Sequence, residues 1–488
     1  MRAIVEQRIA KLKALARSGV NPYPYGYKVS HLSRRLKEGF EELSSRAAEV
    51  AVAGRLMSKR PHGKAAFGHL RDRSGDVQVY FKLDDLGEGA FNLLLEQVDV
   101  GDILGVEGTV FKTRTGEITV HARAFTLLAK AVRPLPEKWH GLKDKETRYR
   151  RRYVDLFVNL DVREVFVKRA AAIASMRNYL DSRDFIEVET PVLQPIYGGA
   201  AASPFVTQHN ALDMKLYLRI ADELYLKRLL VGGLERVYEI AKDFRNEGID
   251  RTHSPEFTQL ELYQAYADYN DMMALFEEMM EKAAMDVVGT TDITYQGRKI
   301  SLARPWKRVL VEDAIRSHAG VDLGKATDDD LRKVCSGIAE GDWAAVDRGG
   351  LVDEIIDHFV QPSLLEPTLL CDYPVETSPL AKVSRRDPRF AERFEPFVLG
   401  MELGNAFSEM NDPLEQRERL LKQREASEEG IDLDFIRALE YGMPPAGGLG
   451  VGVDRVVMLL TDSHSLRDVV LFPQMRHEAE IEEDIDGL

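Results

Sequence analysis

The chain has 488 residues, of which 44% are hydrophobic and 30% are charged, and its net charge is −14. This length exceeds what one hydrophobic core usually supports, so two or three domains are expected, and the acidic balance excludes binding of nucleic acid through overall charge alone. The only two cysteines, Cys335 and Cys371, lack metal-ligand spacing, and no apolar run is long enough to span a bilayer. We therefore expect a globular cytoplasmic protein without a membrane contact.

The first part of the chain predicts a helix followed by short strands. Residues 1–48 contain a helix from about Ala3 to Ser18, which ends before Gly19. Residues 49–133 change to five short segments of strand character that are separated by turn signals. Five short strands in so small a segment predict a partly open Greek-key barrel of the OB type.

Two basic clusters each allow two interpretations. Lys11, Lys13 and Arg17 give the first helix a basic side, which is either a solvated face or a contact with RNA. Residues 134–160 form a linker punctuated by proline. The Arg148–Arg152 cluster in this linker either contacts an RNA backbone or buries arginine in a domain interface.

Residues 161–476 predict a larger α+β domain. It begins with a helix at about Val165–Ser182 and a short strand that ends at Pro191. Residues 307–366 are more helical and acidic, and we interpret them as an insertion between strands of this domain. Residues 477–488 form an acidic tail, which we expect to be mobile and solvated.

The segments Tyr238–Gly248 and Pro255–Tyr263 predict two strands joined by a long loop. Alternate residues of a strand point to the same face, and one face of the second strand combines an aromatic ring, an amide, a carboxylate and a phenol. The residues on this face are Phe257, Gln259, Glu261 and Tyr263. A half-exposed strand explains the alternation but not this mixture, so the pattern indicates a functional hairpin.

A second constellation contains two carboxylates, Glu395 and Glu402, on neighbouring predicted strands. Two carboxylates suit a Mg²⁺ ion whose remaining ligands are mainly substrate phosphates. On a regular strand Glu402 would point to one face and Asn405, Phe407 and Glu409 to the other. Gly404 between them predicts a bulge that lets both groups reach one cavity.

A third constellation is the glycine-rich segment Gly447–Asp454, which is followed by Arg455 at the start of a predicted helix. Alternating glycines allow a backbone to approach a ligand closely. The segment lacks the third glycine of a dinucleotide-binding fingerprint, so this pattern alone is weak evidence.

Together the three constellations resemble a known family. The Phe-Arg-x-Glu sequence at Phe244–Glu247 resembles motif 2 of class II aminoacyl-tRNA synthetases, and the Gly-x-Gly-x-Gly-x-Asp-Arg sequence at Gly448–Arg455 resembles motif 3. The helix and strand that end at Pro191 resemble motif 1. An OB-type domain N-terminal to this core is similar to subclass IIb, which charges lysine, asparagine or aspartate.

Three further segments look like the lysyl members of this subclass. They are Tyr197–Phe205, Ala221–Leu229 and Glu402–Glu409. The resemblance implies a catalytic domain built on an antiparallel sheet with flanking helices, and a homodimer formed through motif 1. It also implies activation of lysine by ATP with Mg²⁺, followed by transfer of lysine to its tRNA.

The resemblance further implies a role for individual residues. For catalysis they are Arg245 and Arg455; for ATP they are Arg245, Glu247, His253, Phe257, Glu395, Glu402 and Arg455; and for Mg²⁺ they are Glu395 and Glu402. For lysine they are Gly199, Glu223, Arg245, Glu261, Tyr263, Asn405, Phe407 and Glu409. For the anticodon they are Phe67, Gln78 and Glu117, although Phe67 could instead be a core aromatic residue of the barrel.

The charge of the predicted amino-acid slot favours lysine. A buried ammonium group needs a carboxylate partner, and Glu409 supplies one. An aspartate-specific site would need a cation there, and the Glu402–Glu409 stretch contains none. Two further functions are disfavoured: a ligase that attaches lysine to a protein would lack the OB-type domain, and a non-catalytic paralogue would not need the arginines and glutamates of the site.

Overall fold

The computed structural model describes residues 2–136, 142–338, 341–424 and 431–476. The chain divides into two compact units, with the boundary between Lys143 and Asp144. The predicted acidic tail, residues 477–488, lies outside the described residues. No helix within the described ranges is long and apolar enough to cross a membrane.

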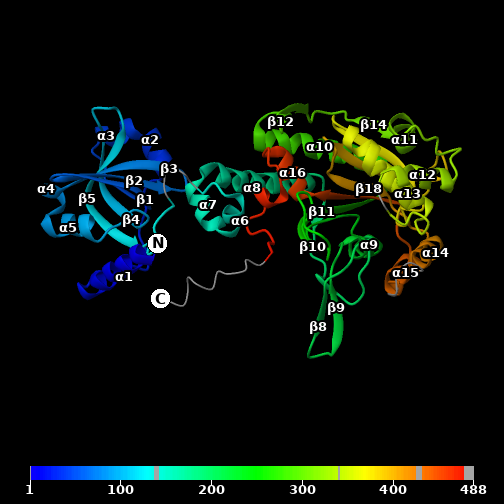
Figure 1. Ribbon diagram of the computed structural model, residues 1–488, viewed down its shortest axis with the longest axis horizontal. Helices are drawn as coiled ribbons and strands as arrows, with labels where there is room; N and C mark the ends of the chain where they lie inside the picture. The colour runs from blue at the N-terminus through cyan, green and yellow to red at the C-terminus, as the bar shows by residue number, and fades with distance from the viewer. Residues whose placement is uncertain (1, 137–141, 339–340, 425–430, 477–488) are drawn as a thin grey trace. The chain divides into compact units, whose positions relative to one another are not determined.

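The described residues of the first unit form a closed β-barrel with accompanying helices (Figure 1). Its elements are α1 (Arg2–Arg17), α2 (Ser33–Glu38), α3 (Phe40–Ser45), β1 (Val50–His62), β2 (Ala65–Asp72), β3 (Gly75–Lys82), α4 (Leu83–Leu86), α5 (Glu88–Glu96), β4 (Ile103–Lys112) and β5 (Ile118–Ala129). The strand order is β1-β2-β3-β5-β4, and β1 closes the barrel because its first half pairs with β4 and its second half with β2.

The five predicted strands are confirmed, but the prediction that the barrel is partly open is wrong. Its closure depends on the length and bend of β1, whose register shifts between Leu56 and Ser58, and a sequence pattern does not reveal such a shift. Alternation along β2 places Ala66 and Leu70 in the barrel core and leaves Phe67 half-buried on the outer face.

Unit 2 begins with helices and small sheets and continues into the large sheet. Its first elements are α6 (Lys145–Arg150), α7 (Arg152–Val158), α8 (Leu160–Asp181), β6 (Ile186–Glu187), β7 (Leu193–Gln194), β8 (Val206–His209), β9 (Met214–Leu218), α9 (Glu223–Val231), β10 (Arg236–Phe244), β11 (Glu256–Ala265), α10 (Tyr269–Val288), β12 (Asp292–Tyr295) and β13 (Arg298–Ser301).

The remaining elements follow in chain order. They are β14 (Lys307–Leu310), α11 (Val311–His318), α12 (Asp328–Ile338), α13 (Arg348–Ile355), the π-helical turn Ile356–Val360, the 3₁₀ turn Gln361–Ser363, β15 (Thr368–Pro374), β16 (Phe390–Val398), β17 (Met401–Glu402), β18 (Gly404–Ser408), α14 (Pro413–Arg424), α15 (Leu433–Glu440), β19 (Ala446–Gly452), α16 (Val453–Leu460) and α17 (Leu466–Val469).

Nine strands of the described residues form one sheet in the order β14-β15-β16-β18-β19-β11-β10-β6, with β17 paired to β16. The central pairings are antiparallel, as predicted, whereas β6 and β14 at the two edges are parallel to their neighbours. Helices α8, α10 and α16 pack on this sheet and share its core, which includes Met176, Phe276 and Val457. The strands in the middle of the sheet are therefore held rigidly on one face.

The segment interpreted as an insertion does not start outside the sheet. Lys307–Leu310 is the edge strand β14, paired with β15, and the additional helices begin only at Val311. Helices α11, α12 and α13 pack in a second core with Leu331 and Leu351, which also includes Leu370 of β15 and Phe397 of β16. The short strand did not stand out in the sequence because its neighbours are strongly helical and acidic.

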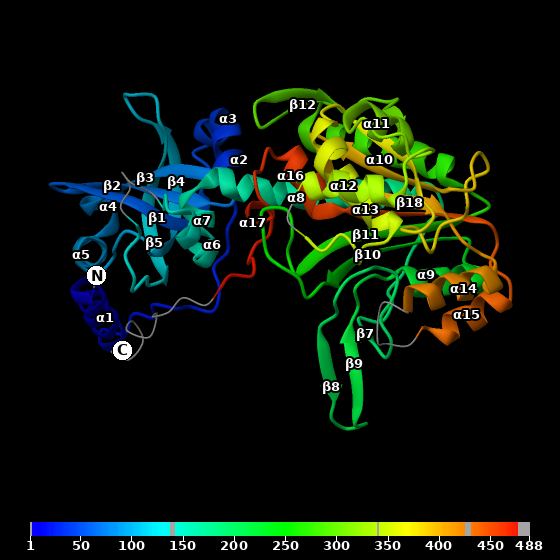
Figure 2. The same cartoon turned by 45° about the vertical axis from the view of Figure 1, so that its right-hand side comes forward.

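A small sheet of β7, β8 and β9 stands apart from the large one. Its order is β7-β9-β8, and the β8–β9 hairpin projects away from the large sheet in both views of the chain (Figures 1 and 2). The hairpin carries exposed apolar side chains, among them Val206 and Met214.

The linker arginines are mainly structural within the second unit. Arg152 is buried and donates hydrogen bonds to the Asp155 carboxylate at 2.8 Å and to the Arg467 carbonyl at 2.7 Å, and Arg148 pairs with Asp155 at 2.9 Å. Arg152 is thus buried inside one unit and not in a domain interface, whereas Arg151 of the same cluster is exposed. In the first unit, Lys11 of α1 pairs with Asp99 at 2.7 Å.

Candidate active site

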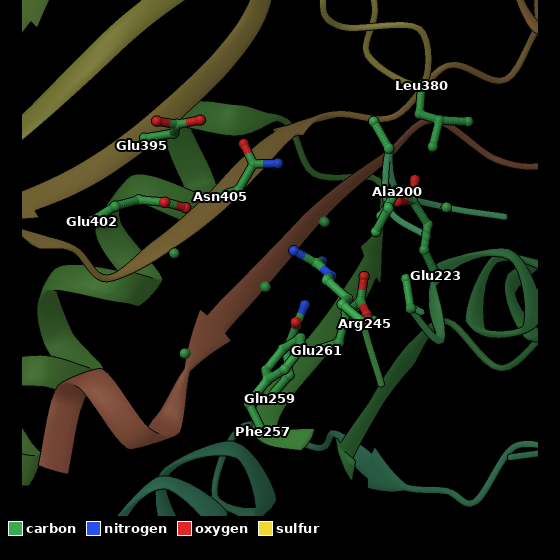
Figure 3. Close-up of a pocket in the computed structure, with 18 of the residues that line it drawn as sticks. Ala200, Glu223, Arg245, Phe257, Gln259, Glu261, Leu380, Glu395, Glu402 and Asn405 are labelled. Carbon is green, nitrogen blue, oxygen red and sulfur yellow. The ribbon is translucent and has the colours of Figure 1, made fainter. Parts of the chain in front are cut away.

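A cavity of about 830 Å³ opens where the central strands of the large sheet meet the N-terminal end of α9. Its walls come from β11, β16, β18 and β19, from the loops at 197–202 and 377–381, and from the start of α16. Figure 3 shows Glu395 and Glu402 toward one end of the cavity and Glu223, Glu261 and Arg245 toward the other. The cavity therefore has two ends of different chemistry.

Strand β11 lies along the floor of the cavity, and its side chains alternate between the cavity and the core as predicted. Phe257, Gln259, Glu261 and Tyr263 line the cavity, whereas Leu260 and Leu262 on the opposite face are fully buried in the core. The strand is central in the sheet, paired with β10 on one side and β19 on the other. Its pocket-facing side chains are therefore attached to a rigid backbone.

One end of the cavity holds a buried cluster of charges around Lys227. The Lys227 ammonium contacts Glu223 Oε1 at 2.6 Å and also forms an ion pair with Glu409 Oε2. It lies 5.9 Å from the centre of the Tyr263 ring and 5.4 Å from that of Phe407. A cation between two carboxylates and two aromatic faces is a strong ammonium-binding arrangement.

This cluster corrects one expectation from the sequence. The Glu402–Glu409 stretch itself contains no cation. Helix α9, however, brings Lys227 to the slot that this stretch lines, where Lys227 pairs with Glu409. Lys227 is shared by two carboxylates, and Glu261 adds a third acidic group to the same wall. The slot therefore stays acidic, although it is not free of positive charge.

Burial makes the carboxylates of this end costly to ionise. It raises the pKa of Glu223 to about 7, with Lys227 acting to lower it and Glu261 to raise it. Burial also raises the pKa of Glu409 well above its usual range, against the opposing effect of Lys227. Beside them Asp222 is fully buried, and its pKa is raised well above normal by burial and by the Glu261 charge. Added positive charge would favour the ionised forms of these groups.

Buried carboxylate oxygens at this end lack a hydrogen-bond donor in the described part of the chain. Glu261 Oε1 accepts a hydrogen bond from the Tyr263 hydroxyl at 2.7 Å. Glu261 Oε2, Glu409 Oε1 and both carboxylate oxygens of Asp222 are buried and have no hydrogen-bond partner among the residues that the structure describes; of these residues, Glu261 and Glu409 line the cavity. Buried carboxylate oxygens without partners are costly, so these two are the natural acceptors for donors of a bound ligand.

Two glycines make room for the acidic side chains. A Cβ atom at Gly448 would lie 1.9 Å from Glu409 Oε1 and 2.5 Å from the Tyr263 ring. Gly199 has a φ of +90°, and a Cβ there would lie 3.3 Å from the Cβ of Glu223. The glycine-rich strand was predicted to let its backbone approach a ligand; at Gly448 the close neighbours are pocket side chains.

Arg245 lies at the end of β10, where the hairpin loop begins. Its guanidinium lies 5.1 Å from the centre of the Phe257 ring, and its Nε donates to the Ile220 carbonyl at 3.5 Å. It is half-buried and lines the cavity. Its planar fork of donors suits carboxylate and phosphate oxygens.

The hairpin loop and the start of α16 converge at the other end. Arg455 donates to the Glu402 carboxylate at 3.0 Å and lies 3.4 Å from His253 Nε2. The other ring nitrogen of His253 bonds Asp250 at 2.8 Å. Glu247 also lines the cavity and is exposed. This end is polar and open, as expected for a site that takes phosphates.

The two carboxylates proposed for a metal face this end from β16 and β17. Glu395 accepts from Arg393 at 2.6 Å and from the Tyr373 hydroxyl at 2.7 Å. Burial raises the pKa of Glu395 to about 7; Arg393 acts to lower it, and the Glu402 charge acts to raise it. Two carboxylates close enough to repel each other fit a divalent cation, which would relieve that repulsion.

In the described ranges no three or more His, Cys, Asp or Glu side chains gather at one point as a complete metal site. A cation at Glu395 and Glu402 would therefore take most of its ligands from a bound substrate. The predicted change of strand parity beside Glu402 is present, because β17 ends before Leu403 and β18 begins at Gly404. Glu402 and Asn405 accordingly both line the cavity.

The structure adds side chains that sequence reasoning did not select. Arg393 donates to Asn405 at 2.9 Å and to Glu395, and so links two of the predicted residues. Asp454 accepts from the Thr258 backbone amide at 2.8 Å and joins α16 to β11. The i, i+4 spacing of Glu223 and Lys227 was a signal in the sequence, since such residues share one helix face.

The barrel residues Phe67, Gln78 and Glu117 form a separate cluster in the first unit. Gln78 donates to Glu117 at 2.9 Å, and the rings of Phe67 and Tyr80 lie 4.9 Å apart. Phe67 is half-buried and is not part of the barrel core. The interpretation of Phe67 as a core aromatic residue is therefore wrong, and its ring is available for stacking.

Comparison with known proteins agrees with both units. Residues 144–476 match the family of tRNA synthetases class II (D, K and N), and residues 50–128 match the OB-fold nucleic acid binding domain. A lysine--tRNA ligase of Carboxydothermus hydrogenoformans is 53% identical over 485 residues, which cover 97% of this chain and 98% of that protein. One of Moorella thermoacetica is 52% identical over 480 residues, with coverage of 97% and 98%. The chain therefore belongs to the lysine--tRNA ligase family of class II tRNA synthetases.

Proposed function

We propose that this chain activates L-lysine with ATP to form lysyl-adenylate and then transfers lysine to the 3′ end of its tRNA. The observation that carries this proposal is the buried acidic end of the cavity. Its carboxylate oxygens Glu261 Oε2 and Glu409 Oε1 have no hydrogen-bond partner in the described part of the chain. A substrate with two ammonium groups supplies the missing positive charge.

The two ammonium groups of lysine take different carboxylates. Glu223 and the backbone at Gly199 receive the α-ammonium, and their proximity supports this pairing. Glu409 receives the ε-ammonium in the slot that Tyr263 and Phe407 line, with Glu261 close behind. Asn405 completes this wall of the cavity. The carboxylate of lysine lies against Arg245.

ATP occupies the opposite end. Its adenine lies between Phe257 and Arg455, with Glu247 at its edge, and His253 faces the departing phosphates. Glu395 and Glu402 hold Mg²⁺, whose positive charge offsets the negative charge of the phosphates. Arg455 is paired with Glu402, so the group assigned to the adenine is linked to a group assigned to Mg²⁺.

Both chemical steps need positioning rather than a protein nucleophile. In the first, a carboxylate oxygen of lysine bonds to the α-phosphorus of ATP while the bond to the β-phosphate oxygen breaks, and pyrophosphate leaves. In the second, a terminal ribose hydroxyl of tRNA bonds to the lysyl carbonyl carbon, loses its proton, and AMP leaves. Arg245 holds the lysine carboxylate against the α-phosphate and stabilises the charge that develops there.

A site for aspartate is disfavoured by the same charges. An aspartate side chain would place a further carboxylate beside Glu409 and Glu261, and Lys227 is already shared between Glu223 and Glu409. Like charges at such distances in a buried site cost several kcal/mol. The barrel also argues against a ligase that modifies proteins, because such an enzyme has no anticodon to read.

Glu409→Gln and Glu402→Gln should have reciprocal effects on pyrophosphate exchange. Glu409→Gln removes the charge partner of the ε-ammonium, worth roughly 1.5–3 kcal/mol, so the KM for lysine should rise about ten- to a hundredfold while the KM for ATP stays within about twofold. Glu402→Gln should instead raise the Mg²⁺ and ATP requirement and leave the KM for lysine unchanged. Each variant controls for the other, and equal effects on both substrates would contradict the assignment of the two ends.

The anticodon is read by the outer face of the barrel. Phe67 stacks on one base, and Gln78 and Glu117 contact base edges. Their mutual hydrogen bond and the half-buried Phe67 ring support this role.

Phe67→Ala should therefore separate tRNA recognition from chemistry. Loss of one stacked base costs roughly 1–3 kcal/mol, so aminoacylation of lysine tRNA should fall about tenfold or more. Lysine-dependent pyrophosphate exchange without tRNA should stay near wild type, because the cavity lies in the other unit. Tyr25→Ala, which removes a fully exposed aromatic residue of the same unit, is the control. A parallel loss of both activities in Phe67→Ala would contradict the stacking role.

The active form is a homodimer. Motif 1, about residues 165–191, and the small sheet that follows it carry a series of exposed apolar side chains, a feature typical of protein interfaces. They are Val167, Ile186, Val192, Leu193, Ile196, Val206 and Met214.

A cytoplasmic location belongs to the same proposal, because both cysteines are buried free thiols, which suits a reducing compartment.

Light scattering should give a mass twice the 55.1 kDa of the chain. Leu193→Glu combined with Val206→Glu should shift the protein to monomers, because two charges would be buried in the interface. Tyr441→Glu, at an exposed aromatic residue that follows α15, should leave the mass unchanged. A fully active wild-type monomer would contradict the dimer.

A further inference from the structure

Lys227 is a buried lysine that the proposed reaction does not use. It belongs to α9, one helical turn after Glu223, and its side chain has no exposed surface. Neighbouring positions of the helix, Leu226 and Leu230, are buried in an apolar cluster. A lysine is rarely buried in this way without a carboxylate partner, and here two carboxylates share it.

The contacts of Lys227 join the two proposed ammonium sites. Its ammonium pairs with Glu223 Oε1 at 2.6 Å and with Glu409 Oε2, which are the carboxylates assigned to the α- and ε-ammonium groups of lysine. The contact uses one oxygen of Glu409 and leaves Oε1 without a hydrogen-bond partner among the described residues. That free oxygen is backed by Gly448, where even a Cβ atom would not fit.

We propose that Lys227 is a positioning residue for the amino-acid substrate: its ion pairs hold Glu223 and Glu409 in place and direct Glu409 Oε1 toward the substrate ε-ammonium. The inference rests on the proposed function, since it concerns the same lysine-binding slot. Lys227 touches neither substrate nor ATP and acts only through the two carboxylates.

The electrostatics of the slot support this role. Burial acts to lower the pKa of Lys227, but Glu223 and Glu409 outweigh it, and the net direction is upward. Lys227 is also the group that most opposes the rise in the pKa of Glu409 caused by burial. Without Lys227, the ionised form of Glu409 would lose its main opposing influence to burial, and a neutral carboxyl group pairs poorly with an ammonium group.

The alternative role for Lys227 is to imitate the substrate by filling the place of its ε-ammonium group. If Lys227 occupied the place of the substrate ε-ammonium, lysine would have to displace it on binding, and removal of its charge would strengthen lysine binding. The two roles therefore predict opposite changes in the KM for lysine.

Lys227→Met tests this directly, because methionine keeps most of the apolar stem and removes the ammonium group. In lysine-dependent pyrophosphate exchange the KM for lysine should rise about tenfold or more, while the KM for ATP should stay within about twofold of wild type. Lys282→Met is the matched control: Lys282 makes an i, i+4 pair with Asp286 at 2.9 Å, but on an exposed helix surface. It should leave both constants unchanged.

A second comparison isolates the action through Glu409. In a Glu409→Gln background, the same Lys227→Met change should raise the KM for lysine less than it does in the wild type, because one of its two partners is already neutral. If Lys227→Met alone fails to fold, the Lys227→Gln variant and the double variant Lys227→Met/Glu409→Gln replace it, since the double variant leaves no unpaired charge on Glu409. The double variant should then bind lysine nearly as well as Glu409→Gln.

Three results would overturn the inference. The first is an unchanged or lower KM for lysine in folded Lys227→Met, which would make Lys227 idle or an imitation of the substrate ε-ammonium group. The second is an equal rise in both KM values, which would mean a general structural role. The third is a full additional loss in the Glu409→Gln background. Failure of the proposed function is separate, because wild-type exchange would then not respond to lysine at all.

Discussion

The chemistry of the site depends on a small number of carboxylates that are buried with too few cations. Glu223, Glu261 and Glu409 lie at one end of the cavity, and Lys227 pairs with Glu223 and Glu409. Ionised carboxylates are costly in such surroundings unless they are paired. The cluster is therefore incomplete by itself, and a ligand with two ammonium groups completes it. We propose that selectivity for lysine follows from this deficit of positive charge rather than from the shape of the cavity alone.

The rest of the second unit holds these buried carboxylates in place and away from solvent. Strand β11 is paired on both sides, and its opposite face is covered by the core that α8, α10 and α16 share. Strand β19 supplies Gly448, which leaves the space in which Glu409 and the Tyr263 ring fit together. Because the carboxylates cannot move far, their charge is directed at the ligand. The rigid sheet thus keeps the carboxylates buried, and their unfavourable burial favours a ligand that brings ammonium groups.

The two ends of the cavity share one strand but differ in exposure. At the amino-acid end Glu409 is fully buried, whereas at the nucleotide end Arg455 is only half-buried and His253 is exposed. Arg245 lies toward the end that holds Glu223 and Glu261 (Figure 3), and in the proposed reaction it holds the carboxylate of lysine against the α-phosphate. No protein nucleophile is required at this junction, because the arrangement brings the two reacting groups together and stabilises the charge that forms.

Local patterns in the sequence predicted much of this architecture. The alternation along Phe257–Tyr263 predicted which face of β11 lines the cavity, and the change of parity near Gly404 predicted that both Glu402 and Asn405 would reach it. These features depend on neighbouring residues alone, and a strand pattern carries that information.

Features that depend on distant residues were not predictable in this way. The closure of the barrel requires the two halves of β1 to pair with different strands, and no local pattern specifies that register. The parallel edge strand Lys307–Leu310 was hidden in a helical context. Lys227 lies within the family-like segment Ala221–Leu229, yet its partner Glu409 lies far along the chain, so only the fold reveals the ion pair. The proposed roles of individual site residues stay predictions until they are measured.

The central claim is that buried carboxylates select the ε-ammonium of lysine. The most direct measurement compares pyrophosphate exchange with lysine and with norleucine, which has nearly the same side chain but no ε-amino group. A site built to pair a buried charge rejects an analogue that lacks it, so kcat/KM should be at least about a thousandfold higher for lysine. A ratio below about tenfold, which a difference in apolar contact alone could produce, would contradict the account.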